Sequence, residues 1–161
     1  MLDIGAANKV APWDFYGKVA AGMCAGSALG KGEMMSQVDT EMGALRAKRS
    51  DVGFKEYVDV MASWAHHYGC GTCGPHSAVA FVYLRDTLKT APLDWYMYEN
   101  FKHAFVIVGR HEDTEAADLS TWNRDAALCD PWRGDGEAEL VMPYAPMRFT
   151  GKKLHLLHRA S

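Results

Sequence analysis

One apolar segment limits the folds open to this chain more than any other. Residues 77–88 read SAVAFVYLRDTL, which as a helix would be apolar on most sides. Pro75 suits the first turn of such a helix, where its missing N–H costs little, and Ala91-Pro92 ends it. Because a helix without a wide polar face has to be covered by other elements, the segment predicts a central, buried helix.

Two amphipathic helices are predicted ahead of this segment. The first spans residues 33–48, and its apolar residues follow at spacings of four, four and three along one face: Met34, Val38, Met42 and Leu45. The second begins after an N-cap at Ser50 or Asp51 and ends near His67. Its apolar positions also share one face: Phe54, Tyr57, Val58, Met61 and Trp64.

The second half of the chain changes to patterns typical of β-strands. Residues 104–108, AFVIV, form a continuous apolar run that Gly109 ends, which predicts a buried strand. A polar stretch that predicts a loop follows, and further strands are predicted at 126–129, 140–142 and 153–157. Helices first and strands afterwards favour an α+β fold, with a helical N-terminal half packed on a small antiparallel sheet.

Size and charge exclude several classes of protein. The chain has 161 residues, of which 48% are hydrophobic and 23% charged, a composition typical of one globular domain. The net charge of −3 gives no electrostatic attraction to nucleic acid or an anionic membrane, and no apolar run is long enough to span one. We interpret residues 1–33 as a Gly/Ala-rich lead-in or linker and residues 34–161 as the domain.

The densest chemical feature is CGTCGPH at residues 70–76, which has three interpretations. Cys73, in a glycine-flanked turn before a helix, is a candidate nucleophile, because a helix N-terminus lowers the pKa of a thiol and offers N–H donors. Cys70 and Cys73 form a C-x-x-C redox candidate, although a thioredoxin-type site needs a strand directly before it. Cys70, Cys73 and His76 could also bind zinc with Cys129, although only one closely spaced ligand pair is present.

A base and an orienting group for Cys73 are available at the ends of two predicted strands. His103 opens the strand HAFVIV, and Asp130 ends the next strand in CDPW. If these strands are neighbours in one sheet, Asp130 can hold the imidazole of His103 in the productive tautomer. The order Cys73, His103, Asp130 on a helix, a strand and a strand fits a papain-like arrangement.

Each of these residues also has a plain structural interpretation. Cys73 could be a small buried residue, His103 a strand-end histidine, and Asp130 a turn starter before a proline. Only the joint pattern favours chemistry, because each of the three lies at the end of an element. Cys24 and Cys129 are interpreted as core thiols. Trp132 is interpreted either as the wall of a cleft beside Asp130 or as a core anchor.

Three short segments carry a family resemblance. In order, CGPHSAVAFVYLRD, HAFVIVGR and CDPW resemble the papain-fold toxin and effector domains of bacteria, within the papain-like and transglutaminase-like cysteine superfamily. The resemblance covers residues 70–132. It implies a papain-like fold with Cys73 as nucleophile, His103 as base and Asp130 as orienting group, and we expect neither a cofactor nor a metal.

The resemblance also implies the class of reaction. The superfamily includes peptidases, glutamine or asparagine deamidases and transglutaminases, all of which pass through a thioester. We expect deamidation of a protein, because a small chain with no visible second lobe has little room for a long peptide cleft. The alternative enzymes are a peptidase and a transglutaminase. The alternative without enzymatic activity is a zinc-stabilised binding module.

One departure from the family concerns the oxyanion hole. Papain-like peptidases usually carry a glutamine a few residues before the nucleophile, and this chain has His66, His67 and Tyr68 in that region. We therefore expect the donors to be the N–H groups of Cys73 and its neighbours, or a side chain from elsewhere.

The resemblance further implies that the protein is delivered into other cells. Many members enter other cells through specialised secretion systems. The apolar residues 19–29 begin too far along the chain, and follow acidic residues, to predict a signal peptide. We therefore expect a secreted virulence effector or toxin that acts on a protein in the target-cell cytoplasm. Its partners would include an immunity protein or a chaperone, with no nucleic acid and no membrane.

Overall fold

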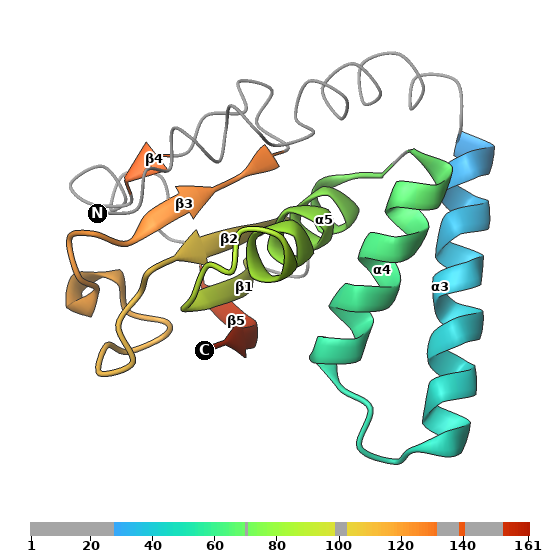
Figure 1. Ribbon diagram of the computed structural model, residues 1–161, viewed down its shortest axis with the longest axis horizontal. Coiled ribbons are helices and arrows are strands. Elements are labelled where there is room, and N and C mark those ends of the chain that lie inside the picture. Colours follow the sequence, from blue (N-terminus) through green and yellow to red (C-terminus); the bar gives the residue numbers. More distant parts are fainter. Residues whose placement is uncertain (1–27, 70, 99–102, 132–138, 141–152) are drawn as a thin grey trace.

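In the computed structural model, the described residues form three helices beside an antiparallel sheet (Figure 1). The structure describes residues 28–69, 71–98, 103–131, 139–140 and 153–161. The helices are α3 (Ala28–Lys48), α4 (Phe54–Tyr68) and α5 (Cys73–Asp86). The strands are β1 (Leu93–Tyr98), β2 (His103–Val108), β3 (Ala127–Cys129), β4 (Glu139–Leu140) and β5 (Leu154–Ala160), with the 3-10 turn η2 (Leu119–Thr121) before β3. The predicted α+β class is confirmed.

Helix α5 packs on both α4 and the sheet, as predicted for the apolar segment (Figure 1). Its buried side chains Ala78, Phe81 and Leu84 share one core with α4 and with the inner face of β1, β2 and β3. The helix begins at Cys73, a turn earlier than predicted, and ends at Asp86, so Leu88 lies outside it and is exposed. The earlier start makes Cys73 itself the first helical residue.

The first two helices differ from the prediction at their N-termini. Helix α3 begins at Ala28, so the predicted boundary between residues 33 and 34 falls inside a helix. The N-cap of α4 is Gly53 rather than Ser50 or Asp51. The carboxylate of Glu56 accepts a hydrogen bond from the Gly53 N–H at 3.2 Å, as in a capping box. Asp51 is instead paired with Arg49 at 2.9 Å.

The sheet has the strand order β4-β3-β2-β1-β5, and all neighbouring described strands are antiparallel. The four predicted strands are present with shifted ends; residues 141–142 of the third lie outside the described residues. Strand β1, between β2 and β5, was not predicted. Asp94 interrupts its apolar pattern, and aspartate is depleted in strands, so this residue argues against a strand in the sequence.

Both faces of β2 are buried, which explains its continuous apolar run. Val106 and Val108 lie in the core shared with α5. Phe105 and Ile107 belong to a second core on the opposite face, with Trp122 from the loop after β2. Alternate residues of the strand thus enter two different cores, and neither face requires polar side chains.

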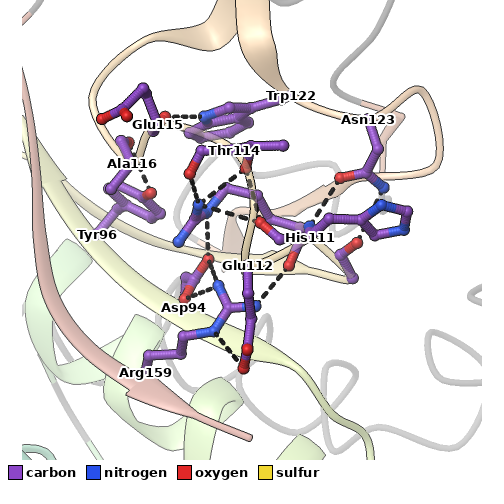
Figure 2. A network of polar contacts seen from close by, with 12 residues as sticks. Asp94, Tyr96, His111, Glu112, Thr114, Glu115, Ala116, Trp122, Asn123 and Arg159 are labelled. Atoms are coloured by element: carbon purple, nitrogen blue, oxygen red, sulfur yellow. Dashed lines mark hydrogen bonds and ion pairs between the residues drawn. The ribbon is translucent and has the colours of Figure 1, made fainter.

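A buried ion network ties the loop after β2 to the sheet (Figure 2). Asp94 of β1 is 1% exposed and accepts hydrogen bonds from Arg110 Nε at 2.6 Å and from Arg159 Nη1 at 2.9 Å. Arg110 also donates to the Thr114 carbonyl, and Arg159 donates to the Arg110 carbonyl at 2.6 Å. The polar residue that obscured β1 in the sequence is therefore held by two arginines that lie far from it along the chain.

Candidate active site

A tight turn between α4 and α5 places Cys73 at a helix N-terminus. Helix α4 ends at Gly69, whose φ of 61° lies in the left-handed region, with its N–H bonded to the Ala65 carbonyl. Gly71 lies against the first turn of α5, where a Cβ would come 2.5 Å from the Cβ of Pro75. Thr72 is the extended N-cap, and Cys73 follows it as the first residue of α5. The half-buried thiol of Cys73 thus lies at the N-terminus of α5, where the N–H of Gly74 in the first turn contacts it.

Strands β2 and β3 bring His103 and Asp130 together. They pair antiparallel with Val106 opposite Cys129, so the residue after β3 is aligned near the start of β2. His103 Nε2 lies 2.7 Å from Asp130 Oδ2, and the two side chains are 16% and 7% exposed. The two strands are neighbours in the sheet, which is the condition stated in the sequence analysis, and Asp130 is placed to hold one ring nitrogen of His103.

The sulfur of Cys73 lies among three hydrogen-bond partners. They are the imidazole of His103, the backbone N–H of Ala104 and the backbone N–H of Gly74. Burial alone would raise the pKa of Cys73, but these contacts and the charge of His103 outweigh it and lower that pKa. The site therefore favours a thiolate.

The pKa of His103 is shifted in the opposite direction to that of Cys73. Burial lowers the pKa of an imidazole, but the hydrogen bonds and charges of Asp130 and Cys73 raise the pKa of His103 to about 9. A lowered thiol pKa beside a raised imidazole pKa favours a thiolate–imidazolium pair at neutral pH. Because Nε2 faces Asp130, Nδ1 is the ring nitrogen available to the sulfur.

Aromatic rings hold the imidazole of His103 in place. The ring of Tyr98 lies 5.3 Å from it and the ring of Phe105 6.2 Å, measured between centroids. Tyr98 is the residue opposite His103 in the pairing of β1 with β2. Sequence reasoning missed Tyr98 because it missed β1; the aromatic content of LDWYMY was the available signal, because aromatic residues are enriched in strands.

The proposed zinc ligands are not gathered in the described part of the chain. His76 is buried in the first turn of α5, with Nδ1 2.8 Å from the Thr72 carbonyl oxygen. Cys129 is buried in the core under α5, where burial raises its pKa to about 12. Among the described residues, no three His, Cys, Asp or Glu side chains are close enough to hold a metal ion. Cys24, Cys70 and Trp132 lie outside the described residues.

Comparisons of the chain with protein-family models, curated proteins and solved structures found no match. The assignment of the site therefore rests on the geometry of Cys73, His103 and Asp130. No helix in the described ranges combines the length and apolar character needed to cross a membrane.

Proposed function

We propose that the protein is a cysteine-dependent amide hydrolase in which Cys73 is the nucleophile. The observation that carries the proposal is the chain of contacts from the Cys73 thiol through the imidazole of His103 to the carboxylate of Asp130. Helix α5, strand β2 and the residue after β3 supply these groups, and the contacts favour the thiolate of Cys73 and the protonated imidazole of His103. A nucleophile, a base and an orienting carboxylate in this order are the parts that acyl transfer needs.

The geometry supports a two-step mechanism. The Cys73 thiolate attacks the amide carbon, and the oxygen gains negative charge near the first-turn N–H groups of α5. The departing ammonia or amine takes a proton from Nδ1 of His103 as the C–N bond breaks, which leaves a thioester. Neutral His103 then removes a proton from water, the hydroxide displaces the Cys73 sulfur, and a carboxylic acid is released. Asp130 holds the Nε2–H of His103 throughout.

Among amide substrates we favour the side chains of glutamine or asparagine in a protein. The described residues form one layer of helices on one sheet, and no second lobe that could form the far wall of a long peptide cleft is among them. A side-chain amide needs only a short slot. Peptide cleavage and transfer to an amine use the same thioester and are the alternatives.

The papain-like character of the α+β fold is part of the same proposal. It is supported by a buried helix that begins at Cys73 and packs on an antiparallel sheet, in which β2 begins at His103 and Asp130 directly follows β3. The role of a secreted effector or toxin, acting on a protein in a target cell, rests on the sequence resemblance alone.

A pH profile of Cys73 alkylation tests the proposed thiolate pair. We expect the rate with iodoacetamide to rise through the lowered pKa of Cys73, to stay level through neutral pH, and to change again near pH 9 as His103 loses its proton. In Asp130→Asn the upper step should move to lower pH, because the charge that raises the pKa of His103 is gone. Asp113→Asn, at an exposed carboxylate, is the control and should leave the profile unchanged. A single step at an ordinary thiol pKa would contradict the proposal.

The reaction itself is tested on mixtures of glutamine- and asparagine-containing proteins. Deamidation would appear by mass spectrometry as conversion of an amide to an acid, peptidase activity as new chain ends, and transglutamination as incorporation of an added amine. The Cys73→Ala variant should produce none of these changes.

A further inference from the structure

A buried hydrogen-bond chain joins the sheet to the first turn of α5. The indole Nε1–H of Trp95, on β1, donates to Ser77 Oγ at 2.9 Å. The hydroxyl of Ser77 in turn donates to the carbonyl oxygen of Gly74 at 2.8 Å. Both side chains are fully buried, at 0% exposure. These two hydrogen bonds thus cross the core at the N-terminal end of α5, the helix that carries Cys73.

One end of this hydrogen-bond chain contacts the residue after Cys73, and the other end lies on β1, the strand that pairs with β2. Ser77 is four residues after Cys73, so the two lie on the same face of α5. Gly74, whose carbonyl accepts the Ser77 hydroxyl, is also the residue whose N–H contacts the Cys73 sulfur. Trp95 pairs with Val106 of β2, the strand whose first residue is His103.

Apolar packing fixes the position of α5 on the sheet less specifically than a hydrogen bond does. The contacts of Ala78, Phe81 and Val106 in this core are non-directional. A hydrogen bond has a preferred length and angle, and a buried one is costly to break. The Trp95–Ser77–Gly74 chain therefore defines where the first turn of α5 stands relative to β1 and β2.

We infer that Ser77 and Trp95 are positioning residues for Cys73. They hold the start of α5 at the place on the sheet where the Cys73 sulfur meets the imidazole of His103 and the N–H of Ala104. Neither side chain touches the reacting atoms; both act through Gly74 and the first helical turn. The inference rests on the proposed function, because it supposes that the Cys73–His103 contact is the catalytic one.

The test is the pH profile of Cys73 alkylation in Ser77→Ala, compared with the wild type. We expect the rate at pH 7 to fall about tenfold and the apparent pKa of Cys73 to rise, because the thiol is displaced from His103. Val58→Ala, which removes a buried side chain of α4 from the same core, is the control. It should weaken the fold and leave the pH profile in place. Trp95→Phe keeps most of the ring, removes the N–H donor, and serves if Ser77→Ala does not fold.

The outcomes separate this inference from the proposed function. A wild-type profile with the lowered thiol pKa, together with a displaced profile in Ser77→Ala or Trp95→Phe, supports the positioning role. A wild-type profile with the lowered pKa that both variants retain overturns the positioning role and leaves the proposed function standing. An ordinary thiol in the wild type overturns both. Equal displacement in Val58→Ala would also overturn the positioning role, because any loss of packing would then suffice.

Discussion

Replacement of His103 by alanine is expected to slow alkylation of Cys73 at pH 7 about tenfold. The contact with His103 lowers the pKa of Cys73 against the opposing effect of burial. Without it, only the N–H groups of Ala104 and Gly74 oppose the effect of burial, so the pKa of Cys73 rises and less of the thiol is ionised at pH 7. The thiolate that remains is more basic and therefore more nucleophilic, which offsets part of the loss. Amide hydrolysis should fall further, by roughly 10²–10⁴-fold, because the proton donor to the leaving group is removed as well.

The matched control for this variant is His155→Ala, which removes an exposed histidine of β5. It should leave both the alkylation rate and the hydrolysis rate unchanged. Stopped-flow or quenched alkylation followed by intact mass gives the rates directly. Equal reactivity of Cys73 in His103→Ala and in the wild type would contradict the thiolate–imidazolium pair.

Replacement of Asp94 by alanine is expected to lower the free energy of unfolding by about 3–5 kcal/mol, the usual cost of removing one partner from a buried ion pair. The reason is that Arg110, whose side chain is 3% exposed, would retain a buried charge without its carboxylate. Arg159 would lose the same partner. A loss of this size shifts the midpoint of thermal unfolding downward by on the order of 10 °C in a chain of this length.

Glu112→Gln is the matched control in the same network. The carboxylate of Glu112 lies 3.9 Å from Arg159 Nε, but its side chain is 76% exposed. Removing its charge should therefore cost less than about 1 kcal/mol. Urea unfolding of both variants gives the two free energies. Similar losses for Asp94→Ala and Glu112→Gln would show that burial of the network is not what makes it stabilising.

The fold could be predicted from the sequence wherever local pattern and burial agree. Residues 77–88 are apolar on most sides and lie within or beside α5, and the run 104–108 became β2 because both of its faces enter a core. Strand β1 could not be found this way. Asp94, its second residue, is satisfied by Arg110 and Arg159, and that pairing depends on tertiary contacts that no local window contains.

The candidate site was predictable because each of its three groups lies at the end of an element with a clear pattern. Cys73 precedes an apolar helix, His103 opens a strand, and Asp130 follows another. What could not be predicted depends on register and packing between elements. Tyr98 and Trp95 lie on the strand that was missed, and the contact of the Ala104 N–H with Cys73 needs the position of α5 on the sheet.

The most direct test of Cys73 as the nucleophile is intact-protein mass after brief alkylation at neutral pH, followed by peptide mapping. We predict one fast-reacting thiol, at Cys73. Cys129 should stay unmodified, because burial raises its pKa to about 12. Cys70→Ser should keep the fast label and Cys73→Ser should lose it, which separates the two cysteines of the C-x-x-C. Slow or uniform labelling of the cysteines, or a fast label that survives in Cys73→Ser, would contradict the assignment of Cys73 as the nucleophile.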